Sequence, residues 1–306
     1  MANLEIIKKR IQSIEVTSKI TFAMKMVTTV KLQKYQKKYQ IYQNYFAGLL
    51  NVFRATINNV DVDLNMVNRL FYRYNKINLE NSTKILYVIF GSDLGMCGHY
   101  NSDLFKNLKN TINDATNAEF LIFGTRIARL ISSQQPDWKI IKIIHHIDKE
   151  LMNHELIFIR AFEVFDYFIK NNYQKIHFVY TQFINSLKLT IQSLQILPLT
   201  LEVYNRKDLF GAYLSEDNLG NYELGFKPES VVLALIPQLF THLFYAVLIE
   251  SKISEASSRY NAMTAATDNA KALLDEYKLE YNRTRQALIT QEIIEIISGA
   301  TKNHKK

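Results

Sequence analysis

The sequence has 306 residues, of which 48% are apolar and 22% are charged, and this balance excludes an intrinsically disordered chain. A single cysteine, Cys97, excludes an internal disulfide and is typical of a reducing compartment. The formal net charge of +8 is concentrated in residues 1–40, which hold nine Lys or Arg and two Glu. A basic segment of this kind favours an acidic partner: nucleic acid, anionic lipid or an acidic protein surface.

The beginning of the chain does not resemble a signal peptide, because charges at Glu5, Lys8, Lys9 and Arg10 interrupt any apolar core. No stretch is predicted to reach the roughly 18 apolar residues that a membrane-spanning helix needs. We therefore expect a soluble chain that is linked to a membrane only through its partners.

Residues 1–60 are predicted to form one long helix. They contain no Pro and a single Gly, Gly48, and apolar residues such as Ile7, Ile11 and Ile14 recur every three or four positions. A helix of this length would extend over about 80 Å. It needs a partner along its apolar stripe to be stable in water.

Residues 61–227 are predicted to form a central α/β domain. Short β-rich runs occupy residues 84–90, 120–123 and 176–180, and helical stretches lie near 103–115, 125–134 and 150–170. This alternation favours a parallel sheet of the Rossmann-like type. The run from 187 to 199 alternates like an edge strand or hairpin, and residues 205–225 are predicted to be a mobile loop.

Residues 228–306 are predicted to form a second long helix. Pro228 suits a first turn, Pro237 predicts a kink, and Gly299 supplies a stop. On one face the apolar residues give way to small ones, which allows another helix to approach closely. The two terminal helices together predict an antiparallel coiled coil around the α/β domain.

The segments that could carry chemistry give no catalytic, cofactor or metal site. The loop 91–101 follows a strand and contains glycines, as phosphate-binding loops do, but it lacks both the P-loop and the GxGxxG patterns. We interpret it as a tight turn. His145, His146 and His154 have no partner at a metal-binding spacing and are interpreted as a solvated or core-edge cluster.

The basic, tyrosine-rich segment 31–45 leaves an alternative open. Stacking tyrosines and lysines could bind single-stranded nucleic acid. The same tyrosines stand at helical spacing, which is more often a packing stripe.

Three segments resemble the gamma subunits of ATP synthases. These are the helix at 7–31 (IKKRIQSIEVTSKITFAMKMVTTVK), the loop at 92–101 (SDLGMCGHYN) and the C-terminal residues 254–300, with MTAATDNAK and YNRTRQALITQEIIEIISGA. The resemblance covers the whole chain. Frequent Lys, Asn, Ile and Tyr favour a divergent bacterial member from an AT-rich, wall-less organism.

The resemblance implies a non-catalytic central shaft inside a ring of three alpha and three beta subunits. ATP or ADP and magnesium would bind to those partners, and this chain would hold no cofactor. An epsilon-type subunit and a membrane c-ring are further partners of the family, and nucleic acid is not one. The implied location is the cytoplasmic side of the membrane, reached through the complex.

The family's functional positions carry over to particular residues. Met24 and Lys25 would lie opposite the acidic lever of beta. Contacts with the catch loops of the ring are implied for Arg285, Gln286, Thr290 and Glu292. Close packing of the shaft is implied for Ser254, Ser258, Ala262 and Ala265.

The chain also departs from the family pattern. Leu94 replaces an arginine, His99 replaces a glycine, and residues 224–227 differ from the usual aromatic and acidic foot. The divergent foot therefore leaves open, beside an ordinary synthase, a gamma-like shaft of a paralogous rotary ATPase coupled to a different machine. The basic segment leaves open, more remotely, a nucleic-acid-binding coiled coil.

Overall fold

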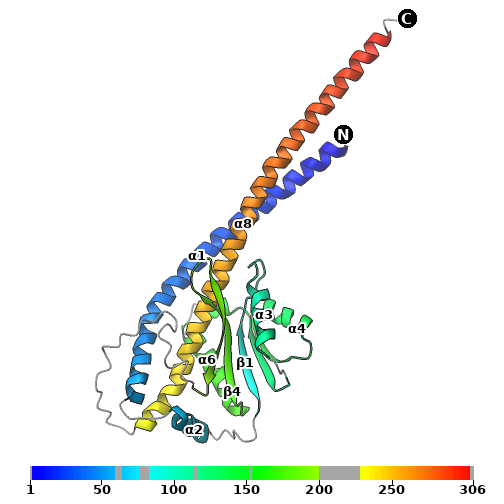
Figure 1. Ribbon diagram of the computed structural model, residues 1–306. Helices are drawn as coiled ribbons and strands as arrows, with labels where there is room; N and C mark the ends of the chain where they lie inside the picture. The colour runs from blue at the N-terminus through cyan, green and yellow to red at the C-terminus, as the bar shows by residue number, and fades with distance from the viewer. Residues whose placement is uncertain are drawn as a thin grey trace. The chain divides into compact units, whose positions relative to one another are not determined.

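The computed structural model has a long helix at each end of the chain, and the residues between these helices in the sequence form an α/β domain (Figure 1). The first helix is α1 (Ala2–Asn58) and the last is α8 (Pro228–Asn303). The chain divides into two compact units. Residues 1–30 and 259–306 form the helical unit, and residues 31–258 form the α/β unit. The structure describes residues 2–58, 64–75, 83–112, 116–151, 154–199 and 228–303.

The α/β unit is built on a five-stranded sheet with the order β3-β2-β1-β4-β5. The first four of these strands are parallel, and β5 is antiparallel to β4 at one edge. Strand β1 has a continuous apolar sequence and β2 is apolar except for Glu119, and both are buried along almost their full length, as expected for inner strands covered on both faces. The strands are β1 (Ile85–Phe90), β2 (Ala118–Phe123), β3 (Lys139–Ile144), β4 (Lys175–Phe183) and β5 (Leu189–Leu197).

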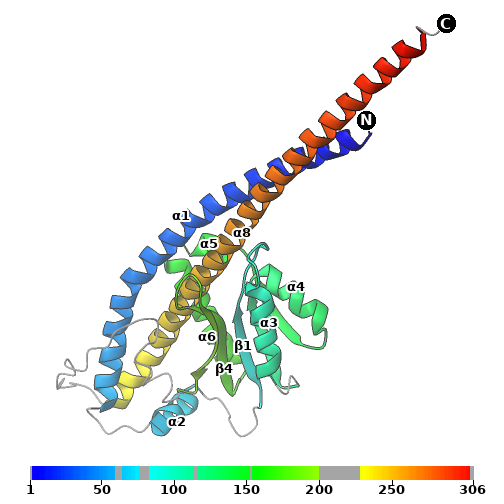
Figure 2. The same ribbon diagram turned by 45° about the horizontal axis from the view of Figure 1, so that its top comes forward.

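Helices cover both faces of the sheet (Figures 1 and 2). One face packs against α3 (Tyr100–Thr111) and α4 (Thr125–Gln134) in a smaller apolar core. The larger core on the other face includes α6 (His154–Lys170) and the first half of α8. This core also contains side chains from α2 (Leu64–Tyr74), α5 (Ile147–Glu150) and the second half of α1.

In the helical unit, α1 and α8 run antiparallel. Arg10 lies beside Tyr277, with Nη1 and the hydroxyl 3.2 Å apart, and further along α1 the Oγ1 atoms of Thr21 and Thr267 are 3.0 Å apart. As the residue number increases along α1, the number of the residue that it contacts in α8 decreases, as in an antiparallel pair. The predicted fold class, an antiparallel pair of long helices with a central α/β domain, is confirmed.

The structure corrects three sequence predictions. Gly299 does not end the second terminal helix, because α8 continues to Asn303. Strand β3 was not predicted, because its sequence KIIKII is short and lies exposed at an edge of the sheet. The prediction that no segment is apolar enough to span a membrane is also wrong. Among the described residues, one helical stretch, Ser230–Ile297, contains an 18-residue window with a mean hydropathy of 2.0. Of that window, 67% is buried inside the protein, as in the core helix of a globular fold.

Other predictions are not tested. The domain limits at 60/61 and 227/228 fall at or beside residues outside the described ranges and stay predictions. The loop predicted at 205–225 and the foot at 224–227 also lie outside the described residues.

Candidate functional site

The loop after β1 is held by its own side chains. Ser92 accepts a hydrogen bond at Oγ from Asn101 Nδ2 (2.7 Å) and donates one to the carbonyl of Leu94 (2.8 Å). Asn101 Oδ1 in turn accepts from the backbone N–H of Ser92, and its Nδ2 lies 3.3 Å from Cys97 Sγ. These contacts fix the turn before α3, which agrees with the interpretation of the loop as a tight structural turn.

Asp93 occupies the place where an external anion could bind at the start of α4. Its Oδ1 accepts hydrogen bonds of 3.0 Å from the backbone N–H and the hydroxyl of Thr125. Its Oδ2 accepts a third, of 3.0 Å, from the backbone N–H of His146. A helix N-terminus favours negative charge, and here the chain supplies that charge itself.

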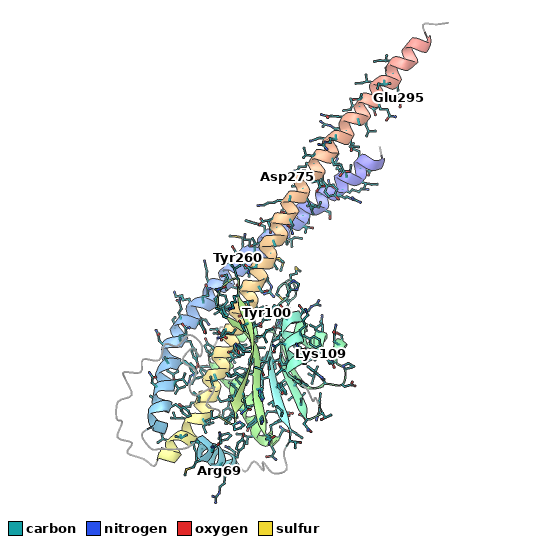
Figure 3. The ribbon with its side chains drawn as sticks, in the orientation of Figure 1. Arg69, Tyr100, Lys109, Tyr260, Asp275 and Glu295 are labelled. Atoms are coloured by element: carbon teal, nitrogen blue, oxygen red, sulfur yellow. The ribbon has the colours of Figure 1, made fainter. Side chains whose placement is uncertain are left out.

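The crevice in which α/β sheets of this kind bind ligands is filled by α8. Ligands usually lie beyond the carboxyl ends of the strands where the strand order reverses, which is between β1 and β4 in this sheet. There Ser251 Oγ donates to the carbonyl of Phe90 (3.1 Å) and lies 2.7 Å from the hydroxyl of Tyr100. Tyr100 is labelled in Figure 3. Ser254 Oγ donates to the carbonyl of Thr181 in β4 (2.8 Å).

Ser258 continues this seam by donating to the carbonyl of Cys97 (2.7 Å). The small residues of α8 therefore lie against the sheet and the loop after β1 within the α/β unit. They let a helix approach backbone carbonyls closely enough for hydroxyls to satisfy them. This geometry favours a structural role, the attachment of α8 to the sheet, for the position at which other proteins of this architecture bind a nucleotide.

An ionic cluster centred on the buried Lys252 joins α8, α5 and α1. The side chain of Lys252 is only 3% exposed, and its Nζ lies 2.9 Å from both Asp148 Oδ1 and Glu255 Oε2. Asp148 Oδ2 also contacts Lys31 Nζ at 3.0 Å. Three helices that are distant in the sequence thus share one set of charges.

The charges of this cluster support one another. Burial opposes the charge of Lys252, but the carboxylates of Glu255 and Asp148 together raise its pKa. Burial likewise disfavours the Asp148 carboxylate, but Lys252 and Lys31 lower its pKa to about 2. The pKa of Tyr35 is raised, first by burial and then by the negative charge of Asp148. Lys252, Asp148 and Tyr35 are therefore each held in one charge state near neutral pH.

Sequence reasoning missed this cluster. The only local signal was Lys252 and Glu255 at an i, i+3 spacing within a run of apolar and small residues. Asp148 comes from another element and could not be paired with them from the sequence.

The residues implied as ring contacts lie in the helical unit. Met24 and Lys25 are half-buried on α1, and the Lys25 ammonium lies 5.3 Å from the ring centre of Tyr260. On α8, the side chains around Asp275 and Glu295 project outward (Figure 3). The four predicted contact residues in this part of α8, which are all exposed, are Arg285, Gln286, Thr290 and Glu292.

The residues implied in shaft packing divide between the two units. Ser254 and Ser258 belong to the α/β unit and make the hydrogen bonds described above. Ala262 is half-buried and Ala265 is exposed in the helical unit. The contact and packing roles of all these residues stay predictions.

The histidines show no metal-binding arrangement in the described part of the chain, where no group of three potential ligands comes together. His145 Nδ1 lies 2.9 Å from the hydroxyl of Thr125. His146 has a left-handed backbone conformation with φ of 57°, and the side chain of His154 is outside the described set.

Comparison with known proteins agrees with the resemblance in the sequence. The family model described as ATP synthase matches residues 3–301. The ATP synthase gamma chain of Mycoplasmoides gallisepticum is 33% identical over 99% of this chain and all of the relative. That of Malacoplasma penetrans is 33% identical over 98% of this chain and 99% of the relative.

Solved structures share the fold. A chain of the Euglena gracilis mitochondrial ATP synthase, in a structure of OSCP, F1 and c-ring, aligns with a TM-score of 0.56 and 21% identity, covering 92% of this chain and 95% of that one. A chain of the Tetrahymena thermophila mitochondrial ATP synthase central stalk and c-ring aligns with a TM-score of 0.54 and 21% identity, covering 81% and 99%.

Proposed function

The chain belongs to the ATP synthase gamma chain family, and on that premise we propose that it is the central rotor shaft of an F-type rotary ATPase. In this role it transmits rotation between a membrane rotor and a ring of three alpha-type and three beta-type subunits. ATP, ADP and magnesium bind to the ring, and the gamma chain itself performs no chemistry.

The observation that carries this proposal is the exposed apolar surface of the helical unit. On α1, Phe22, Val27 and Val30 are more than half exposed, and on α8 so are Ile293 and Ile296. Large exposed apolar surfaces mark places that partners cover. A surrounding ring of subunits would cover such a surface on all sides, which a single binding partner would not.

The filled crevice supports a non-catalytic role. Ser251 and Tyr100 occupy the ligand position of the sheet, and Asp93 takes the anion position at α4. A nucleotide entering either place would have to displace a helix or the hydrogen-bonded Asp93 carboxylate.

The contacts that we infer between this chain and the alpha and beta subunits of the ring are individually weak. Arg285 and Glu292, which are exposed, would meet charged groups of alpha and beta at a surface where ion pairs contribute only about 0–1 kcal/mol each. Contacts of that strength can be exchanged as the shaft turns from one beta subunit to the next. Through the complex, the chain would lie on the cytoplasmic side of the membrane.

Native mass spectrometry of the complex purified through a tag on this chain tests the proposal. We expect one copy with three alpha-type and three beta-type chains, and further subunits of the membrane rotor. The purified chain alone should hydrolyse no ATP. A complex without alpha and beta chains, or ATP turnover by the chain alone, would overturn the proposal, and the same hexamer with unrelated proteins would indicate a paralogous machine.

A further inference from the structure

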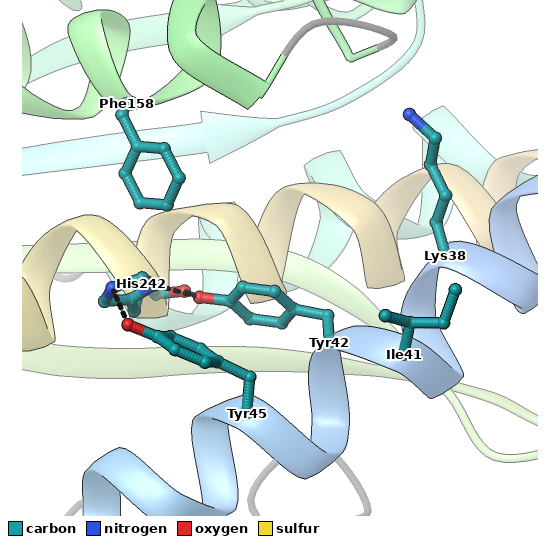
Figure 4. Close-up of a pocket in the computed structure, with 6 residues that line it drawn as sticks. All are labelled: Lys38, Ile41, Tyr42, Tyr45, Phe158 and His242. Atoms are coloured by element: carbon teal, nitrogen blue, oxygen red, sulfur yellow. Dashed lines mark hydrogen bonds between the residues drawn. The ribbon is translucent and has the colours of Figure 1, made fainter.

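An apolar groove lies between three helices of the α/β unit (Figure 4). Its volume is about 550 Å³, within the size range of binding pockets. Tyr42 fixes one wall, because its hydroxyl lies 2.7 Å from His242 Nδ1 and also donates to the His242 carbonyl at 2.9 Å. The lining residues are Lys38, Ile41, Tyr42 and Tyr45 from α1, Phe158 from α6 and His242 from α8.

The rim of this groove is exposed and apolar. Ile41 is 67% exposed and Tyr45 is 58% exposed on α1. On α6, Phe162 is 57% exposed and stands one turn beyond Phe158, so the two rings are neighbours on the helix surface. The neighbouring side of α6, with residues such as Ala161, packs in the core, and Phe162 is left exposed beside it. Large exposed apolar side chains mark surfaces that partners cover.

Positive charge lies directly beside the apolar rim. Lys34, Lys37 and Lys38 precede Ile41 and Tyr45 on α1 at helical spacing, and α1 has no acidic residue after Glu15. Burial and the nearby charge of Lys34 lower the pKa of Lys38, which indicates crowding of like charge. On the adjoining surface, α6 contributes Glu155 and an ion pair between Arg160 and Glu163, whose Nη1 and Oε2 atoms are 3.0 Å apart. The α1 side of the groove is thus basic at one end and apolar at the other.

We propose that this groove, with the lysines beside it, binds an amphipathic helix of a partner protein, with apolar side chains in the groove and Asp or Glu side chains facing Lys34 and Lys37. The stretch from Lys34 to Tyr45 extends for about 16 Å, three helical turns, which suits a helix laid along it. An anionic membrane fits less well, since a membrane-binding face must protrude into the lipid, whereas this apolar surface is concave. The proposal is independent of the rotor assignment.

Site-specific photo-crosslinking in the intact complex identifies the occupant. The full-length chain carries p-benzoyl-phenylalanine at position 41 in one variant and at position 109, an exposed lysine on α3, in the control. We expect the first variant alone to give a protein adduct. The crosslinked peptide should have apolar residues three or four apart, flanked by acidic ones. Lipid adducts alone, or equal yields at both positions, would overturn the proposal.

Affinity measurements with the identified peptide test whether the apolar and the charged side chains of the groove both contribute to binding. Ile41→Asp should weaken binding by at least about tenfold, and so should Lys34→Glu with Lys37→Glu. Because these side chains are exposed, the variants should fold normally. The matched control, Lys106→Glu with Lys109→Glu on α3, should leave the affinity unchanged. Reversing the peptide's acidic residues to lysine should restore binding to the Lys34→Glu, Lys37→Glu variant; unchanged affinity in that variant, or no rescue, would contradict the proposal.

Discussion

The α/β unit buries its large apolar side chains, whereas the helical unit leaves many of its own in water. In the α/β unit Phe90, Phe123 and Phe244 are at most 1% exposed, and their rings contact one another. In the helical unit Val27, Ile293 and Ile296 are at least half exposed. The first unit is therefore stabilised by its own core, and the second presents a surface for other chains.

The difference extends to the ion pairs. The α/β unit encloses Lys252 between two carboxylates, and the helical unit holds Lys278 and Glu15 4.0 Å apart at its surface. A buried charge must keep its partners, because desolvation makes its isolation costly, whereas a surface pair is easily exchanged.

The largest effect is expected from core truncation. Phe244→Ala removes a ring that contacts three other phenylalanines and should lower the free energy of unfolding by about 3–5 kcal/mol. Ile293→Ala in the helical unit should change it by less than about 0.5 kcal/mol. Urea unfolding followed by circular dichroism measures both. Equal losses would mean that the two units do not differ in this way.

The next effect concerns the buried charges. Lys252→Met removes the ammonium that faces Asp148 and Glu255 and should destabilise the chain by about 3 kcal/mol. The control Lys278→Met removes one member of a surface pair and should cost about 0–1 kcal/mol. If both variants were equally stable in urea, the ionic cluster would have no structural role.

A smaller effect depends on pH. The folded-state pKa of Asp148, about 2, lies below its ordinary value of 3.8, so its contribution to stability is complete above pH 3.8 and is lost as pH falls toward 2. The stability difference between the wild-type chain and Asp148→Asn should therefore shrink over that interval. A difference that stays constant from pH 5 to pH 2.5 would exclude this assignment.

The smallest effect on the isolated chain is expected at Ala265. Because this residue is exposed, Ala265→Trp should alter the unfolding free energy by less than about 0.5 kcal/mol. In the rotor assignment the indole would collide with the surrounding ring, so the variant should not assemble with alpha and beta chains. Lys109→Trp on α3 serves as the control for co-purification. Recovery of a normal complex from Ala265→Trp would argue against the placement of this segment within the ring.

Local patterns were sufficient for much of the fold. The absence of Pro and Gly from long stretches predicted both terminal helices, and the apolar runs at 84–90, 120–123 and 176–180 predicted three of the strands. Strand β3 was not predicted, because its two lysines, which suit an exposed edge strand, interrupt the apolar run that marks an inner strand. The hydropathy of α8 was underestimated from the sequence. Pro237 and scattered polar residues interrupt its apolar run, but the mean hydropathy of the 18-residue window is still 2.0.

The sequence by itself determined the family, the element types and the basic character of α1, because these depend on residue identity and spacing along one chain. Only the tertiary structure decided that Ser251 and Ser254 fill the crevice of the sheet, that Asp148 meets Lys252, and that Tyr45 and Phe158 line one groove. Each of these contacts joins elements about 70 or more positions apart in the sequence. Periodicity reports which face of an element is apolar, but packing alone determines what that face meets.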